Sequence, residues 1–203
     1  MIPIQTKPTR LWFLNQGCHQ VPLKHSKNKV RWGHPDGYFL KPDGQKAKDN
    51  LSPNKKASHG HLAPILRECS KECHLLMALA FYGERPTFTD RKGKPYVGIC
   101  HHLVPNLLDY RPANLLCWLT REEHGIADYR QRALKTVVPD GDLTLIPYDR
   151  LRQLQDPRVL TDEQFAEELE AIRAKGFHLS DPLAAAASEP ARDYDIFVER
   201  DDS

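Results

Sequence analysis

Two adjacent histidines, His101 and His102, end an apolar run, and Asn114 and His124 follow them closely. An imidazole has an unperturbed pKa of about 6.5, so it accepts a proton from water near neutral pH. Its neutral nitrogens also bind divalent metal ions. Hydrolysis of a phosphodiester needs both functions, a base that activates water and a cation that neutralises charge on the phosphoryl oxygens. These residue types therefore point to metal-assisted hydrolysis.

Strands are predicted on both sides of a loop around these residues. Tyr96, Val97 and Ile99 favour a strand that runs into the two histidines. Leu115 to Leu119 form a second apolar run of strand length, and prolines and polar residues break any period in residues 103–113. Neighbouring side chains on a strand point to opposite faces, so a single core rarely accommodates both histidines. For both rings to reach one phosphate, the first strand must bend at its end.

A helix is predicted from residue 121. Thr120 to Glu123 has the form of a capping box, in which the threonine side chain and Glu123 each bond to a backbone amide of the other residue. His124 then lies in the first turn of the helix. Asn114 precedes the second strand, where its amide can tie the 103–113 loop and fix the orientation of the base.

Further elements are predicted from caps and apolar patterns. Thr161 to Gln164 forms a second capping box, and Phe165, Leu169 and Ile172 then share one face of a helix that Gly176 ends. The remaining expectations are a helix from about Ser70 to Gly83, a short strand at residues 38–40, and a core or edge strand at Trp12-Phe13-Leu14.

The charge of the chain is divided between its halves. Residues 1–100 hold 17 Lys and Arg against 7 Asp and Glu, and residues 101–203 hold 12 against 20. Such a basic half suggests a polyanion partner, although a solvated lysine-rich surface gives the same count. With 28% charged residues, no apolar run of about 20 residues and no apolar signal core at the start, we expect a cytoplasmic protein without a membrane segment.

The order strand, loop, strand, helix, with His101-His102, Asn114-Leu115 and His124 in these places, resembles the HNH endonucleases. Their motif is the ββα-metal, or His-Me finger, unit. The run CHLLMALAFYGERP is similar to the helix that precedes this motif in phage and intron-encoded HNH homing endonucleases, and DYRPANL to the loop before the second strand. The resemblance covers about residues 70–135. The spacing from Asn114 to His124 is one residue longer than the family pattern.

The resemblance implies an α+β fold with a small ββα-metal core at residues 70–135. Outside this core, charge and composition predict a basic N-terminal region at 1–69 that contacts DNA, a C-terminal strand and helical segment at 136–180, and an acidic, mobile tail at 181–203 that is open to a protein partner. The implied activity is metal-dependent DNA hydrolysis, and the implied origin is a phage or a mobile element.

The resemblance also implies a role for each residue. His102 is the general base, Asn114 supports it, and His101 and His124 bind one divalent ion. That ion is Mg²⁺ or Mn²⁺, with Zn²⁺ or Ni²⁺ also suited to imidazole ligands. Arg121, Arg130 and Arg132 lie on or beside the predicted helix and are placed to contact the DNA backbone, although a solvated helix face explains them equally well.

Two other interpretations remain open. The first is a non-catalytic DNA-binding or regulatory module on a decayed HNH scaffold. The second is a zinc-stabilised structural protein, in which Cys69, Cys73 and His74 bind the ion together with Cys18, His19 or Cys100. No C-x2-C pair occurs, and the five cysteines are odd in number and scattered, so free buried thiols are the simpler expectation.

Overall fold

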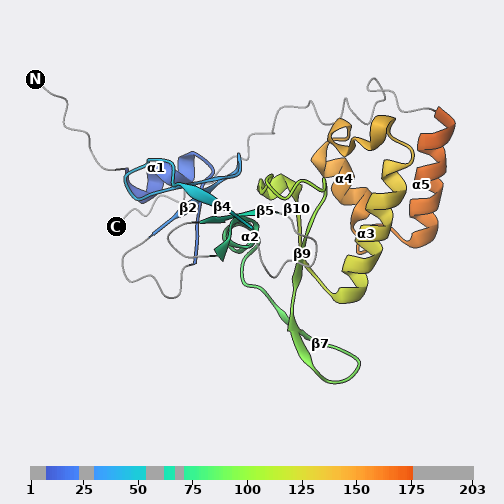
Figure 1. The fold of residues 1–203 in the computed structure, drawn as a ribbon, viewed down its shortest axis with the longest axis horizontal. Helices are drawn as coiled ribbons and strands as arrows, with labels where there is room; N and C mark the ends of the chain where they lie inside the picture. The colour runs from blue at the N-terminus through green and yellow to red at the C-terminus, as the bar shows by residue number, and fades with distance from the viewer. Residues whose placement is uncertain (1–7, 23–29, 54–61, 67–70, 176–203) are drawn as a thin grey trace, which may run out of the picture.

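The computed structural model describes residues 8–22, 30–53, 62–66 and 71–175. Within these ranges the chain is α+β, with small antiparallel sheets in its N-terminal part and helices in its C-terminal part (Figure 1). The α-helices are α1 (Arg10–Asn15), α2 (Cys73–Tyr82), α3 (Arg121–Lys135), α4 (Tyr148–Gln155) and α5 (Asp162–Lys175). Three short 3-10 helices cover Pro112–Asn114, Pro139–Gly141 and Leu143–Leu145. The expected α+β class is confirmed.

The strands pair in four separate antiparallel sheets within the described ranges. The first has the order β1 (His19–Gln20), β2 (Trp32–His34), β3 (Tyr38–Leu40), and the second the order β4 (Asp49–Pro53), β5 (Leu62–Leu66), β6 (Lys71–Glu72). The other two are the pairs β7 (Thr87–Thr89) with β8 (Pro95–Val97), and β9 (Ile99–His102) with β10 (Leu115–Leu119). The expected strand at residues 38–40 is confirmed as β3.

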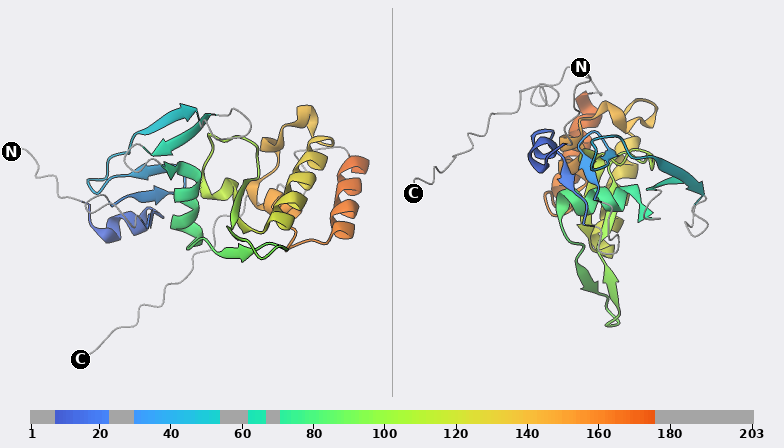
Figure 2. Two further views of the ribbon diagram at one scale, coloured as in Figure 1. Left: turned by 60° about the horizontal axis from the view of Figure 1, so that its bottom comes forward. Right: turned by 90° about the vertical axis from the view of Figure 1, so that its left-hand side faces the viewer.

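The β9–β10 pair lies between α2 on one side and α3 and α4 on the other (Figures 1 and 2). A hydrophobic core lies on each of these two sides. Leu115 packs in the core formed with α2, and its neighbour Leu116 packs in the core formed with α3, α4 and α5. This alternation follows from the pleat of a strand, which turns successive side chains to opposite faces. Successive residue pairs of β9–β10 therefore alternate, with His102 and Leu115 on the α2 side and His101 and Leu116 on the α3 side.

The predicted order of strand, loop, strand and helix is present. His102 pairs with Leu115 and His101 with Leu116, and residues 103–114 connect the strands. Thr120 Oγ1 accepts a hydrogen bond from the Glu123 amide at 3.1 Å, and the Glu123 carboxylate accepts one from the Thr120 amide at 2.7 Å. The capping box is thus complete, and α3 begins at Arg121.

A bulge in β10 absorbs one residue before the helix. Leu116 pairs with His101, but Leu119 pairs with Ile99, so three steps along β10 match two steps along β9. Trp118 adopts a positive φ of 63° at this point. The bulge therefore takes up one residue of β10 shortly before α3 begins, beside the start of β9.

Helix predictions from caps are largely confirmed. Helix α2 ends at Gly83 with a φ of 80°, as predicted, but begins at Cys73 because Lys71–Glu72 pairs as strand β6. Thr161 and Gln164 form the second capping box, with hydrogen bonds of 2.9 and 3.2 Å. Phe165, Leu169 and Ile172 of α5 pack in the core that α5 forms with α3 and α4. Ser70, Gly176 and the acidic tail lie outside the described residues.

Two expectations were wrong. Trp12-Phe13-Leu14 lies in helix α1, which Thr9 caps through its hydroxyl, and only Phe13 is buried while Trp12 and Leu14 are exposed. No strand occurs at described residues 136–175. The apolar run there begins with a 3-10 helix at Leu143–Leu145, because Leu143 and Ile146 both pack toward the α3 core, whereas a strand would alternate and needs a pairing partner. Among the described helices, none has the length and apolar character needed to cross a membrane.

Candidate metal centre

His101 is held in one orientation by side chains from two helices. Its ring is buried, with 5% of the residue exposed, on the α3 side of β9. Its Nε2 lies 3.1 Å from Gln155 Oε1 in α4 and 3.3 Å from Gln131 Nε2 in α3. The opposite ring nitrogen, Nδ1, lies 3.2 Å from Asp128 Oδ1. One edge of the ring therefore faces amides and the other faces a carboxylate.

The amides fix the tautomer of His101. The Gln131 NH₂ group donates to the carbonyls of His102 at 2.6 Å and Leu103 at 3.0 Å, so it has no proton left for His101. Gln155 Nε2 donates to the Leu103 carbonyl at 2.9 Å, which turns its Oε1 toward the ring. His101 Nε2 must then be the donor to Gln155, and in the neutral ring Nδ1 carries the lone pair.

His124 and Asp128 complete a cluster on one face of α3. They are four residues apart on the helix and so lie one turn apart, with His124 Nδ1 3.6 Å from Asp128 Oδ2. The ring centroids of His101 and His124 are 5.4 Å apart, edge to face. One ligand atom from each of the three residues lies within 4.8 Å of the others. Among the described residues this is the one group of three or more potential metal ligands that meets that geometry.

The donor set fits a divalent cation. Ligands about 2.1 Å from one ion lie about 3.0–3.4 Å apart at tetrahedral or cis octahedral angles. The 3.2 Å separation of His101 Nδ1 from Asp128 Oδ1 already lies in this range, and His124 Nδ1, 3.6 Å from the other carboxylate oxygen, needs a small movement. The lone pair of His101 Nδ1 and the Asp128 carboxylate repel each other unless a proton or a cation lies between them. Burial lowers the pKa of His101 and so disfavours its protonation, although the hydrogen bond to Gln155 and the charge of Asp128 raise the pKa. A bound cation removes the repulsion without protonating the buried ring.

His102 points to the other face of β9. Its ring packs against His74 of α2, with centroids 5.2 Å apart, and 8% of the residue is exposed. Both ring nitrogens are buried without a hydrogen-bond partner of good geometry. Burial lowers the pKa of His102 to about 4, and the neighbouring His74 adds to the effect. The strand stays paired through His102, so the bend that would bring both rings to one phosphate is not seen.

Asn114 ties the loop as the sequence predicts. The residue is fully buried, its Oδ1 accepts from the Val104 amide at 2.8 Å, and its Nδ2 donates to the Asp109 carbonyl at 2.9 Å. The Leu103 amide in turn donates to the Asn114 carbonyl at 2.9 Å. Both ends of the 103–113 loop are therefore fixed beside the two histidines, and Asn114 is placed as a support and not as a ligand.

The three arginines have different surroundings. Arg121 is exposed at the start of α3, and Arg132 is exposed near its end. Arg130 is 1% exposed, and its guanidinium donates to the carbonyls of Asp156 and Leu160 and to the Asp162 carboxylate. We correct the assignment of Arg130, because a guanidinium enclosed by three partners joins α3 to the start of α5 and does not reach a nucleic acid.

The described cysteines are free thiols. Cys100 and Cys117 face each other across β9–β10, with sulfur atoms 3.0 Å apart. Cys73 is buried at the start of α2, and Cys18 is buried in the N-terminal core. Cys69, which the zinc interpretation requires, lies outside the described residues. The described cysteines form no metal-binding group with other potential ligands.

Sequence reasoning missed Asp128, Gln131 and Gln155. Asp128 had a readable signal, because a carboxylate four residues after a predicted helical ligand lies on the same face of the helix. Gln131 follows at the next turn of that face. Gln155 has no such signal, since only the packing of α4 on α3 brings it to His101, 54 residues earlier in the chain.

Comparison with known proteins adds no assignment. No family model matches the chain, and neither a curated protein nor a solved structure resembles it at a significant level.

Proposed function

We propose that this chain is a divalent-metal-dependent DNA endonuclease of HNH type that hydrolyses phosphodiester bonds. The observation that carries the proposal is the convergence of His101, His124 and Asp128 on one point of a strand–loop–strand–helix unit. The resemblance of the His-His, Asn and His pattern to the HNH family supports the choice of reaction.

His101, His124 and Asp128 would hold the ion. The ion supplies positive charge against the phosphoryl oxygens and the leaving oxygen. Two imidazoles suit Mn²⁺, Zn²⁺ or Ni²⁺, and the carboxylate also suits Mg²⁺. Gln155 and Gln131 orient His101 and hold it in the tautomer whose Nδ1 can bind a cation.

His102 is the proposed general base. A pKa near 4 keeps its ring neutral at pH 7, which is the form that accepts a proton. Asn114 restrains the loop that follows His102 and so limits the movement of the ring. His102 packs against α2, on the opposite face of β9 from the metal ligands. Its action on a phosphate held by the ion therefore requires that the end of β9 bend and that His74 or the 103–113 loop move aside.

One observation favours a second candidate, a non-catalytic nucleic-acid-binding module. The burial of both nitrogens of His102 is the state expected of a histidine that packs in a core. In that case the metal centre stabilises the fold and the chain binds DNA without cutting it.

Nicking of supercoiled plasmid separates the two candidates. The full chain is incubated with Mg²⁺ or Mn²⁺, with EDTA as a blank, and is compared with His102→Ala and with His19→Ala, an exposed histidine of β1. The endonuclease proposal predicts metal-dependent nicking that His102→Ala reduces at least ~100-fold, in line with general-base contributions, and that His19→Ala leaves unchanged. Plasmid binding without nicking, or nicking that persists in His102→Ala, contradicts it.

A further inference from the structure

The β7–β8 hairpin extends away from the body of the molecule and returns directly into the candidate metal centre (Figures 1 and 2). Strand β8 ends at Val97, and β9, which carries His101, begins at Ile99. Gly98 between them approaches the backbone of Trp118 so closely that a Cβ there would lie 3.2 Å from its Cα. The Arg85 guanidinium donates to the Gly98 carbonyl at 2.5 Å. The base of the hairpin is therefore fixed against β10.

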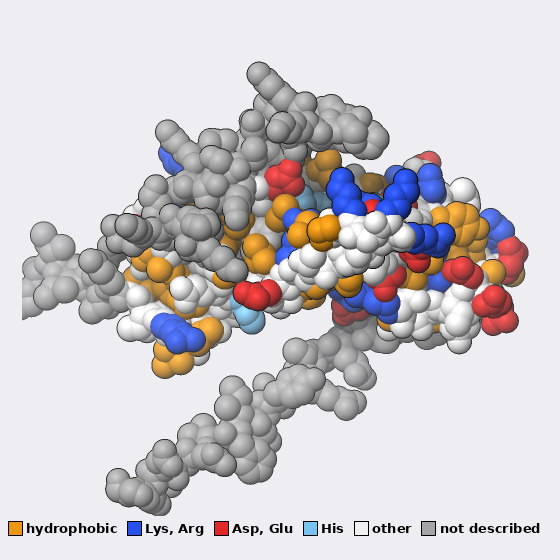
Figure 3. All heavy atoms as spheres, turned by 90° about the horizontal axis from the view of Figure 1, so that it is seen from below, with side chains coloured by type: hydrophobic (Ala, Val, Ile, Leu, Met, Phe, Trp, Pro, Cys, Tyr) orange, Lys and Arg blue, Asp and Glu red, His pale blue; other side chains and the backbone are white. Residues whose placement is uncertain are grey.

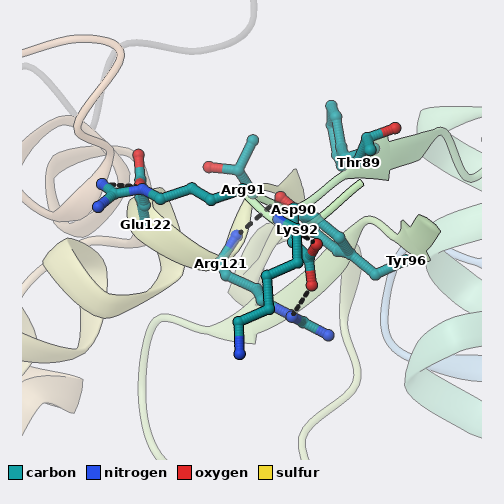
Figure 4. A pocket seen from close by; sticks show the side chains of 9 residues that line it. Thr89, Asp90, Arg91, Lys92, Tyr96, Arg121 and Glu122 are labelled. Carbon is teal, nitrogen blue, oxygen red and sulfur yellow. Dashed lines mark hydrogen bonds and ion pairs between the residues drawn. The ribbon is translucent and has the colours of Figure 1, made fainter. Parts of the chain in front are cut away.

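An open cleft of about 790 Å³ lies between this hairpin and the first turn of α3 (Figure 4). Its charged lining comes from Asp90, Arg91 and Lys92 of the hairpin turn and from Arg121 and Glu122 of the helix. His124 is three residues beyond Arg121 on the same helix, a rise of about 4.5 Å, so the cleft and the metal centre lie about one turn apart along α3. Viewed from below, with the hairpin toward the viewer, Lys and Arg side chains gather near the centre of this face (Figure 3).

The positive charges of the cleft are available to a ligand. Lys92 lines the cleft and Lys94 lies two residues further on the same turn; both are exposed and form no ion pair with any described residue. Arg91 pairs with Glu122 at 2.6 Å, but their side chains are 91% and 72% exposed, so a phosphate can replace the carboxylate at little cost. Arg121 lies 3.4 Å from Asp90 and is 56% exposed. Glu123 is turned away into the capping box.

The turn that presents the lysines is preorganised. Asp90 Oδ1 accepts hydrogen bonds from the amides of Lys92 and Lys94, each at 2.9 Å, and Gly93 takes a φ of 75°. The Asp90 carboxylate is thus partly used inside the turn. Little conformational entropy is lost from the backbone when an anion binds to this turn.

The aromatic residues of the cleft are not free to stack on bases. The Arg121 guanidinium lies over the Tyr96 ring, 4.5 Å from its centroid, and Phe88 packs against the same ring at 5.7 Å. Single-strand-binding sites need exposed aromatic platforms, whereas contacts to a duplex backbone need cations alone. The chemistry of the cleft therefore suits phosphates more than bases.

We propose that the β7–β8 hairpin and the first turn of α3 bind the sugar-phosphate backbone of duplex DNA through Lys92, Lys94 and Arg121. This inference rests on the proposed function and adds the surface that delivers the substrate to the metal centre. The contact is independent of base sequence. The hairpin therefore contributes affinity, and no discrimination between sites.

The test measures binding of the full chain to a fluorescent 30-base-pair duplex by anisotropy, in EDTA so that cleavage does not interfere. The double variant Lys92→Ala/Lys94→Ala is compared with Lys135→Ala/Arg173→Ala, which removes two cations from exposed positions on α3 and α5. Only the side chains change at the turn, so its hydrogen bonds remain, and thermal unfolding of each variant checks the fold.

We expect Lys92→Ala/Lys94→Ala to weaken binding about 10-fold or more and to reduce the slope of log K against log salt by about 2, equally for duplexes of unrelated sequence. The α3/α5 double variant should keep the wild-type affinity and slope. Equal effects of the two double variants, an unchanged hairpin variant, or no duplex binding by the wild type overturns the inference. Plasmid nicking is scored separately, so a chain that binds through the hairpin without nicking supports this inference while contradicting the endonuclease.

Discussion

His101 Nδ1 and Asp128 Oδ1 lie 3.2 Å apart, and in the neutral tautomer that Gln155 imposes on His101 both atoms are hydrogen-bond acceptors. The two residues come from different elements, since His101 lies in β9, one residue before its end, and Asp128 lies about two turns into α3. Such a pair is repulsive until a cation or a proton joins it. The same arrangement makes the metal-free protein sensitive to the charge at position 128.

Asp128→Asn should separate metal binding from metal-free stability. An asparagine NH₂ can donate to His101 Nδ1, so the metal-free variant should unfold at the wild-type temperature or slightly above it. Mn²⁺ at ~100-fold excess over its Kd should raise the Tm of the wild type by about 5 °C or more, and should leave the variant almost unshifted. Glu122→Gln, an exposed acid on the same helix, is the control and should respond like the wild type. An equal Mn²⁺ response in Asp128→Asn would remove Asp128 from the site.

Gln155→Leu should weaken both the fold and the metal centre. The change leaves the His101 Nε2–H and one lone pair of the Leu103 carbonyl without their partner, at a cost of about 1–3 kcal/mol in the free energy of unfolding. Loss of the group that orients a ligand should also reduce Mn²⁺ affinity about 10–100-fold. Urea denaturation and calorimetric titration measure the two effects. Gln153→Leu, on the exposed side of the same helix, should change neither.

His74 should make the fold sensitive to acid. Burial, with Arg85 nearby, lowers the pKa of His74 to about 4 in the folded chain, against about 6.5 when unfolded. The unfolded chain therefore binds more protons in this window, so stability should be full above pH ~6.5 and fall as the pH drops toward 4. The loss from this group is about 3 kcal/mol at most.

His74→Gln should reduce the slope of unfolding free energy against pH between pH 6.5 and 4, measured by urea denaturation at each pH. His19→Gln, on the exposed strand β1, should retain the wild-type slope. A wild-type curve that is flat over this window would show that His74 is not held neutral in the folded state.

Asn114→Asp should destabilise the loop beside the histidines. The aspartate keeps an acceptor for the Val104 amide but loses the donor to the Asp109 carbonyl and places a charge in a fully buried position. We expect a loss of about 2–4 kcal/mol in the free energy of unfolding. Asn106→Asp, on the exposed part of the same loop, is the matched control and should cost less than about 0.5 kcal/mol. A small effect at position 114 would mean that the loop is held by other contacts.

The sequence predicts the local elements of this site and not the contacts between distant ones. The capping box at Thr120 and the apolar run at Leu115–Leu119 are local signals, so the start of α3 and strand β10 were predictable. The alternation of His101 and His102 across β9 was also predictable from the pleat. Which face of β9 meets which helix was not predictable, because it depends on the packing of α2, which precedes the strand pair, and of α4, which follows it.

Two misassignments have physical causes. Nothing local in the sequence distinguishes Arg130 from a surface cation, because its partners are the Asp162 carboxylate of α5 and the carbonyls of Asp156 and Leu160 before it. The Trp12 to Leu14 run has strand-like composition, but Thr9 supplies a helix cap and only Phe13 has a core to enter. The bulge at Trp118 was also not predictable, because nothing in residues 115–119 requires it. It depends on where α3 packs.

The most direct test of the metal centre is an anomalous difference map, at the manganese edge, from a crystal of the full chain soaked in Mn²⁺. The account predicts a single strong peak about 2.0–2.3 Å from His101 Nδ1, with His124 and Asp128 as the other protein ligands. Manganese bound elsewhere while these three side chains stay unliganded would contradict it.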